Sequence, residues 1–191
     1  MIAGIVLAAG RSVRMGEGSF KQLLPIGGRP MVSVVAAHAV GSQLDRVVVV
    51  TGHRGDEVGA AVRNEGASVA HNPDYIRGNM TSFRTGYQAL PECDAYLILL
   101  ADMPGVTGEM INRFVSIWHE RHPWAAVSSY WDRRGHPLLL SAAAMAEAVH
   151  RTEARAVWRL LAEAPDVVNV EFDCSAPADI NTPVDYRELT K

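Results

Sequence analysis

The sequence has few cysteines, no excess of basic charge and no long apolar run. Cys93 and Cys174 are the only cysteines among 191 residues, and neither has a Cys or His at the spacing of a zinc ligand. This excludes a disulfide framework and argues against a zinc site. The net charge of -3 lacks the electrostatic footprint typical of nucleic-acid-binding proteins, so we expect no nucleic-acid partner.

Membrane and export signals are also missing. No apolar run approaches the ~20 residues that a membrane-spanning helix requires. The apolar start at residues 1–9 has no basic residues before it and is ended by Gly10 and Arg11, unlike a secretory signal. We therefore expect a soluble cytoplasmic protein with no membrane partner. Its length and composition, with 48% hydrophobic residues, suit one domain over residues 1–191.

Short apolar runs rich in β-branched residues alternate with helix-like patterns over the first two-thirds of the chain. Such runs are typical of strands buried on both faces of a parallel sheet. Their alternation with helices predicts an α/β fold with a doubly wound, mostly parallel, Rossmann-like sheet. The predicted strands cover residues 2–9, 46–51, 67–71, 95–101 and 125–130, and the predicted helices cover residues 30–40, 55–64, 82–90 and 109–121.

The last third of the chain has a different pattern, which predicts a smaller mixed extension of the sheet. Strands are expected at residues 135–140 and 167–172, and helices at residues 142–150 and 155–164. A terminal helix is expected from Pro183, with Thr182 as its N-cap. There is no internal repeat and no linker, so the chain is not divided.

A loop of small residues follows the first predicted strand. In open α/β sheets, ligands bind at the carboxyl ends of the strands, so this loop is a candidate site. The segment 8–16 lets a ligand approach the backbone closely, and Arg11, Arg14 and Lys21 add three cations. It fits neither the P-loop nor the dinucleotide fingerprint, which needs glycine at Ser12. We favour phosphate binding over the alternative, an ordinary basic surface turn.

The run Leu7-Ala-Ala-Gly-Arg-Ser-Val-Arg-Met-Gly, followed by Lys21, resembles the nucleotidyltransferase superfamily of sugar-phosphate and molybdenum cofactor nucleotidyltransferases. These enzymes couple a nucleoside triphosphate to a phosphorylated acceptor and release pyrophosphate. The resemblance implies that the loop wraps the triphosphate and that Arg14 and Lys21 contact it. The nucleotide-binding positions it implies on this loop are Leu7, Ala8, Ala9, Gly10, Arg11, Arg14 and Lys21.

Two carboxylates are candidates for a metal site. Asp102 ends a strongly apolar run, and Asp179 lies three residues before Thr182. Asp102 has a local alternative as a turn or cap carboxylate, whereas Asp179 lies near a helix start but is not needed for its cap. The resemblance implies that both aspartates bind Mg²⁺, which takes one or two carboxylates together with substrate phosphates. The chain departs from the family pattern at Asn181 and Val184, where aspartate and glutamate are usual, but both leading aspartates are kept.

The segment 71–82 follows the third predicted strand and is similar to a segment of the molybdopterin cytidylyltransferase branch. The resemblance implies that Gly78 and Ser82 line the base pocket. The alternative is a helix N-terminus, capped by Asn79, Thr81 or Ser82. Both interpretations are compatible, since a helix N-terminus also favours anionic ligands.

Arg133-Arg-Gly-His-Pro also matches this branch, where it lies on the acceptor side of the cleft. The resemblance implies that Arg134, Gly135 and His136 bind the acceptor, and guanidinium groups suit phosphate oxygens. The two arginines could equally be solvated turn charges. The tryptophans are scattered and are interpreted as core or rim residues rather than a stacking platform: Trp118, Trp124, Trp131 and Trp158.

The choice of nucleotide depends on Ala9. The cytidylyl branch has Leu-Ala-Ala-Gly where the guanylyl branch has Leu-Ala-Gly-Gly, so Ala9 predicts CTP over GTP through the shape of the pocket. The chain thus resembles the molybdenum cofactor cytidylyltransferases. This implies CTP and a phosphorylated pterin as substrates, Mg²⁺ as cofactor, and a molybdenum hydroxylase or its maturation factor downstream. Two alternatives stay open: a guanylyl or other nucleotidyltransferase with a different phosphorylated acceptor, and a non-catalytic nucleotide- or cofactor-binding module.

Overall fold

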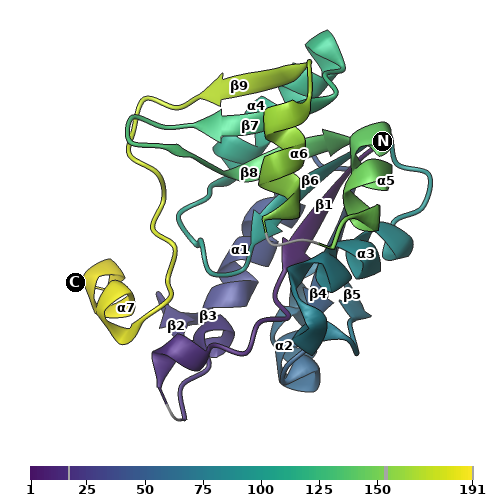
Figure 1. The fold of residues 1–191 in the computed structure, drawn as a ribbon. Coiled ribbons are helices and arrows are strands. Elements are labelled where there is room, and N and C mark those ends of the chain that lie inside the picture. The colour runs from purple at the N-terminus through teal and green to yellow at the C-terminus, as the bar shows by residue number, and fades with distance from the viewer. Residues whose placement is uncertain (17, 153–154, 191) are drawn as a thin grey trace.

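The computed structural model describes residues 1–16, 18–152 and 155–190, and one seven-stranded sheet runs through it (Figure 1). The strand order is β5-β4-β1-β6-β8-β7-β9. Strand β8 pairs antiparallel with β6 and β7, and every other pairing in this sheet is parallel. The strands are β1 (Ile2–Leu7), β4 (Arg46–Thr51), β5 (Ser68–His71), β6 (Ala95–Leu100), β7 (Ala125–Ser129), β8 (Arg134–Ser141) and β9 (Val167–Glu171).

Helices cover both faces of the sheet, because successive strand residues point to opposite sides. On β6, Leu97 and Leu99 pack on one face, and Tyr96 and Ile98 pack on the other. Three helices cover the first face, and three others cover the second (Figure 1). They are α1 (Met31–Val40), α2 (Gly55–Val62) and α4 (Gly108–Arg121), then α3 (Asn79–Ala89), α5 (Ala142–His150) and α6 (Ala156–Glu163).

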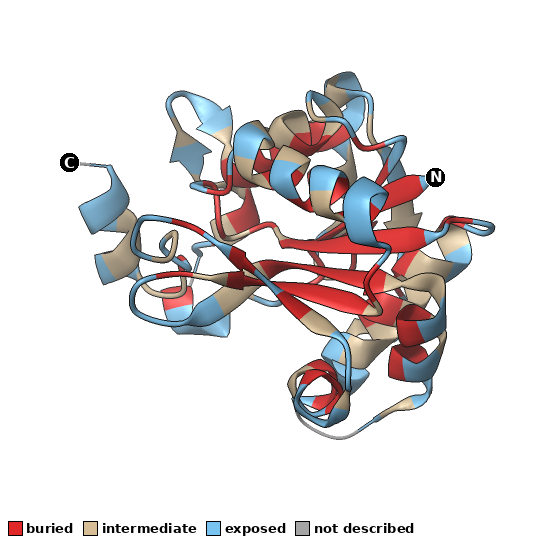
Figure 2. Ribbon diagram, turned by 90° about the horizontal axis from the view of Figure 1, so that it is seen from above, coloured by how far each residue is buried: buried red, intermediate tan, exposed pale blue. Residues whose placement is uncertain are grey.

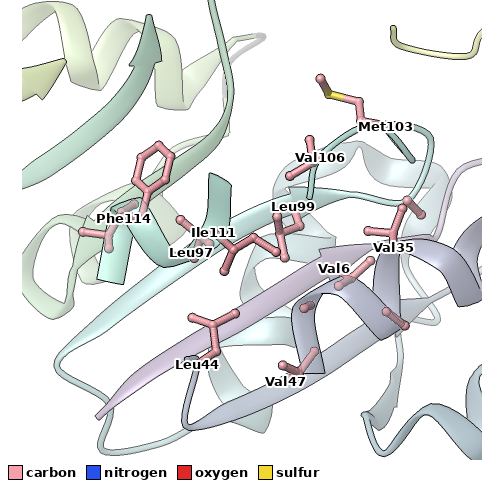
Figure 3. Packing of buried hydrophobic residues seen from close by; sticks show 14 of the residues in the cluster. Val6, Val35, Leu44, Val47, Leu97, Leu99, Met103, Val106, Ile111 and Phe114 are labelled. Atoms are coloured by element: carbon pink, nitrogen blue, oxygen red, sulfur yellow. The ribbon is translucent and has the colours of Figure 1, made fainter. Parts of the chain in front are cut away.

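The core is continuous across the central strands, which are buried along most of their length (Figure 2). Figure 3 shows the first face, where Val35 of α1 and Ile111 of α4 pack over Val6 and Leu99. The predicted fold, a doubly wound and mostly parallel α/β sheet with a mixed extension, is confirmed. Strand β1 lies between β4 and β6, so the chain passes from one side of β1 to the other after β5. This change of side creates a crevice at the carboxyl ends of the strands.

Two predicted helix starts differ from the observed ones. Helix α3 begins at Asn79, three residues before the predicted start, and Gly78 is its N-cap without a side-chain cap. The side chains of Thr81 and Ser82 do not cap the helix, because both hydroxyls accept from Asn72 Nδ2, at 2.8 and 3.0 Å. They hold the preceding loop in place instead.

The second prediction, a helix over residues 30–40, is off by one residue, because Pro30 is the N-cap of α1 and not its first helical residue. Pro30 lies in β3 (Arg29–Pro30), which pairs with β2 (Pro25–Ile26) in a small hairpin. Gly27 and Gly28 make the turn with φ values of 57° and 81°, which favour glycine.

The C-terminal helix α7 (Pro183–Leu189) is capped as predicted. Thr182 accepts from the Asp185 N–H, and the Asp185 carboxylate accepts from the Thr182 N–H at 2.7 Å, which completes a capping box. Helix α7 lies away from the sheet, beyond the hairpin, and Tyr186 donates to the Pro25 carbonyl at 2.7 Å (Figure 1). In the described ranges, no helix is long and apolar enough to cross a membrane.

Candidate functional site

A cavity of about 450 Å³ lies at the carboxyl ends of β1 and β6, where the fold predicts a ligand. It brings together side chains from the start, the middle and the end of the chain. Most of the predicted nucleotide and metal positions line it: Leu7, Ala9, Gly10, Arg11, Arg14, Lys21, Ser82, Asp102 and Asp179.

Two predicted nucleotide positions lie elsewhere. Ala8 is buried, and its N–H donates to the Val50 carbonyl at 2.9 Å, so this N–H is already used by the sheet. Gly78 lines a neighbouring cavity rather than this one. The loop that was expected to wrap a triphosphate therefore presents Ala9 and the residues after it, and not Ala8.

The shape of the loop after β1 is held by Gln22, which the sequence analysis did not single out. Gln22 is buried, donates to the Gly10 carbonyl at 3.2 Å and accepts from Ser12 Oγ at 2.7 Å. The Lys21 N–H donates to the same Ser12 hydroxyl at 3.2 Å. These bonds fix Ser12 in the left-handed region, at a φ of 55°, and keep the loop open toward the cavity.

Two cations of the site, Arg14 and Lys21, contact the same side chain, Asn181. The Oδ1 atom of Asn181 accepts from Arg14 at 2.7 Å and from Lys21 Nζ at 3.0 Å. Lys21 also forms an ion pair with Asp102, and only 11% of its side chain is exposed. Asn181 stands where the family pattern usually has aspartate, and it still joins the two cations. The sequence offered one signal for it, its place two residues after Asp179 in the same motif.

Asp102 is placed by the chain on both sides of it. It lies two residues after the end of β6, and both of its neighbours in the chain, Ala101 and Met103, are buried; Figure 3 shows Met103 in the core. Its backbone carbonyl accepts from the Ile180 N–H at 2.9 Å, and Ile180 is fully buried. This pairing anchors Asp179 beside Asp102. Asp102 is not a helix cap, because Thr107 caps the following helix.

The charge of Asp179 affects Asp102 electrostatically. Burial raises the pKa of Asp102, Lys21 opposes the rise, and the negative charge of Asp179 adds to it. A divalent cation between them would offset this repulsion, so the pair fits Mg²⁺ chemically. Magnesium commonly takes one or two carboxylates together with substrate phosphate oxygens, so two aspartates are enough for the protein's share of such a site.

One wall of the cavity is closely packed around Gly52, at the end of β4. A Cβ atom on Gly52 would lie 2.8 Å from the Ala9 Cβ, 2.9 Å from the Ala9 carbonyl oxygen and 2.7 Å from the Tyr75 Cβ. Ala9 and Tyr75 both line the cavity. Glycine at position 52 therefore lets the loop of Ala9 approach the loop that carries Tyr75.

We expect Gly52→Ala to raise the KM for nucleotide about tenfold or more, because one methyl group must displace backbone atoms of the loop. The KM for the acceptor should change by less than twofold. Gly59→Ala is the matched control: its Cβ would lie 3.7 Å from Val69 Cγ1, an ordinary contact. Steady-state kinetics of the two variants would test this, and an unchanged nucleotide KM in Gly52→Ala would contradict it.

A second cavity, of about 780 Å³, adjoins the first and shares Leu100 and Asp179 with it. The predicted acceptor residues Arg134, Gly135 and His136 line this second cavity. The His136 ring lies edge-on to Trp158, with ring centroids 5.7 Å apart. Burial lowers the pKa of His136 to about 4, and Asp179 opposes this effect weakly. His136 is therefore a neutral hydrogen-bonding group at pH 7.

This lowered pKa should make the folded protein less stable in mild acid. In the unfolded chain, His136 gains a proton below about pH 6.5. In the folded protein, the His136 ring stays neutral down to about pH 4. Between pH 7.5 and pH 5 this residue should remove about 2 kcal/mol from the free energy of unfolding. Urea unfolding should show that the free energy of unfolding falls less between pH 7.5 and pH 5 in His136→Asn than in the wild type. His119→Asn, an exposed control on α4, should behave like the wild type. Equal losses in all three would contradict this.

Comparison with known proteins agrees with this geometry. The model of the MobA-like NTP transferase domain matches residues 4–168. The chain belongs to this family. It is 30% identical to the molybdenum cofactor cytidylyltransferase of Escherichia coli K12, over 95% of this chain and 92% of that protein. The chain is thus an enzyme of the nucleotidyltransferase kind, related to cytidylyltransferases.

Other proteins are also similar to this chain. Nicotine blue oxidoreductase of Paenarthrobacter nicotinovorans is 33% identical over 74% of this chain and 71% of its own. The crystal structure of Rv0371c from Mycobacterium tuberculosis H37Rv is 28% identical, covers 99% of this chain and 97% of its own, and has a TM-score of 0.88. A complex of that protein with manganese has a TM-score of 0.85, at 27% identity, over 99% of this chain and 97% of that one.

Proposed function

We propose that this MobA-like protein is a Mg²⁺-dependent nucleotidyltransferase that transfers CMP from CTP to the terminal phosphate of molybdopterin, releasing pyrophosphate. The observation that carries the proposal is the convergence of Arg14, Lys21, Asp102 and Asp179 on one cavity. This cavity opens onto an arginine-lined second cavity at Asp179. Two cations and two carboxylates suit a metal-bound triphosphate, and the adjoining cavity suits an anionic acceptor.

The residues divide the chemistry between them. Arg14 and Lys21 bind and orient the triphosphate, and Asp102 and Asp179 hold the metal ion. When bound, Mg²⁺ would neutralise charge on the phosphate oxygens. The acceptor phosphate is already ionised near neutral pH, so the reaction requires no general base, and positioning and charge neutralisation carry it. The neutral His136 is suited to orient the acceptor by a hydrogen bond rather than to attract its charge.

The preference for CTP is supported by the packing at Ala9. Ala9 is nearly buried, and its Cβ and carbonyl face Gly52. It therefore has no room to retreat from a larger base. We expect turnover with CTP to exceed turnover with GTP by about tenfold or more, in line with the steric discrimination of small pockets. Comparable turnover of CTP and GTP by the purified protein would contradict this part of the proposal.

Further parts of the proposal concern the cellular setting. We propose a single catalytic domain over residues 1–191, a cytoplasmic location, and a molybdenum hydroxylase or its maturation factor as recipient of the product. The relationship to the cytidylyltransferase of Escherichia coli supports the acceptor, and the manganese complex of Rv0371c supports a divalent cation.

The test is pyrophosphate release by the purified protein with Mg²⁺, molybdopterin and each of the four nucleoside triphosphates in turn. The proposal expects release that requires all three components and is fastest with CTP. Release with another phosphorylated acceptor, and none with molybdopterin, would favour a different acceptor. Binding of CTP without any release would identify a binding module instead.

A further inference from the structure

Helix α6 presents two different faces, and one of them is not explained by the fold. Val157, Leu160 and Leu161 are buried against the sheet. The opposite face lines the second cavity with side chains spaced three or four residues apart, which places them on one stripe of the helix. These residues are Arg155, Trp158, Arg159 and Ala162.

The charge of this cavity is strongly one-sided. Arg133 and Arg134 come from the β7–β8 side, Arg155 from the N-cap of α6 and Arg159 from α6 itself, while Asp179 is the only carboxylate among the described residues of the lining. Across the described ranges, neither Arg134 nor either α6 arginine has a carboxylate within 4.0 Å. Four arginines around one cavity therefore indicate a ligand with more than one anionic group.

The backbone at Arg155 supports this interpretation. Arg155 is the N-cap of α6, with a φ of 59°, in the left-handed region that favours glycine. Such a conformation costs of order 1 kcal/mol for a non-glycine residue and is concentrated at functional sites. Here it accompanies a side chain that lines both the second cavity and a third one, of about 810 Å³.

Aromatic and apolar side chains lie beside these charges. Trp158 and His136 line both the second and the third cavity, and the third also contains Met80 and Phe83. Trp158 is only partly buried, so its ring is available for contact. A ring system of a ligand could lie against Trp158 while its anionic groups reach the arginines.

We propose that the cavity-facing side of α6 selects an acceptor that carries a planar ring and at least one anionic group besides the attacking phosphate. Arg155 and Arg159 bind the additional anionic groups, and Trp158 contacts the ring. The inference rests on the proposed nucleotidyl transfer, because it assigns the second cavity to the acceptor. A cavity with this selectivity would bind ringless phosphates, such as polyol phosphates, poorly as acceptors.

The test measures binding of molybdopterin to the nucleotide-free protein by calorimetry, with glycerol 3-phosphate as the ringless probe. Arg155→Gln and Arg159→Gln should each weaken molybdopterin binding about tenfold, the range expected for hydrogen bonds to charged groups. Trp158→Leu should weaken it similarly and Trp158→Phe should restore most of it. Arg121→Gln, an exposed arginine at the end of α4, is the matched control. Binding of CTP should be unchanged in all five variants.

The outcomes separate the inference from the proposed function. If α6 selects the acceptor, the three weakening variants lose molybdopterin binding and raise the acceptor KM while the CTP dissociation constant stays constant. Molybdopterin binding within twofold of the wild type in Arg155→Gln, Arg159→Gln and Trp158→Leu would overturn the inference. Glycerol 3-phosphate binding as tightly as molybdopterin would overturn it too. Failure of the proposed function would show differently, as absence of pyrophosphate release by the wild type.

Discussion

Replacing Asp102 by asparagine should abolish nucleotidyl transfer and leave the protein folded. The substitution keeps the shape of the side chain but removes the charge that would hold the cation and that pairs with Lys21. Because burial already raises the pKa of Asp102, the neutral amide should be tolerated in the fold. We expect kcat to fall by about a thousandfold or more, as for loss of a major electrostatic group in an active site.

Asp56→Asn is the matched control for this experiment. Asp56 is exposed in the first turn of α2 and absent from the cavity lining. It should keep near-wild-type turnover. Circular dichroism and thermal unfolding should show both variants folded. Turnover close to the wild type in a folded Asp102→Asn would refute the metal-binding role of Asp102.

Replacing Lys21 by alanine should produce the second-largest loss of nucleotidyl transfer activity. Lys21 is one of only two lysines in the sequence, and its ammonium group contacts both Asp102 and Asn181. Its loss would remove a cation from the triphosphate site and leave Asp102 without its partner. We expect kcat/KM for CTP to fall by about a hundredfold to a thousandfold, the effect typical of one well-placed electrostatic group.

Lys21→Arg should restore little of this activity. The Lys21 ammonium is a compact charge in a narrow position, with 11% of its side chain exposed, and a guanidinium group has a different shape. Arg187→Gln, on α7, serves as control for loss of a positive charge elsewhere. The double variant with Asp102→Asn should lose less than the sum of the two single losses, since the residues act as a unit. Full activity of Lys21→Ala, or additive losses, would contradict this.

Several features of the fold could be predicted from local sequence patterns. The apolar runs gave all seven strands of the large sheet, because strands buried on both faces leave a strong continuous signal. The signal that predicted a helix start at Thr182–Pro183 was also local. The hairpin around Gly27 was missed, because each of its strands has only two residues.

The site was predictable only in part, for a similar reason. Asp102 and Asp179 are 77 positions apart, and no periodicity connects them; the Ile180–Asp102 backbone bond that brings them together is a tertiary contact. Gln22 and Gly52 act through what they touch, so the sequence alone gave no reason to select them. Trp158 was interpreted as core or rim, and its place beside His136 became visible only with the sheet assembled.

Membership of the family does not by itself decide the substrate. One relative, which is 33% identical to this chain over 74% of its length, is named as an oxidoreductase. Unrelated functions recur on one fold, so the chemistry must be argued from the site. The paired cations and carboxylates around the loop of Ala9 and Gly10 support transfer from a triphosphate, and the product of the reaction can establish it.

The most direct measurement follows the phosphorus atoms of CTP. The purified protein would be incubated with Mg²⁺, molybdopterin and CTP labelled at either the α- or the γ-phosphate. The account predicts that the α-label appears in a molybdopterin cytosine dinucleotide and the γ-label in pyrophosphate, in equal amounts. Release of the γ-label as inorganic phosphate, or an acceptor without the α-label, would contradict it.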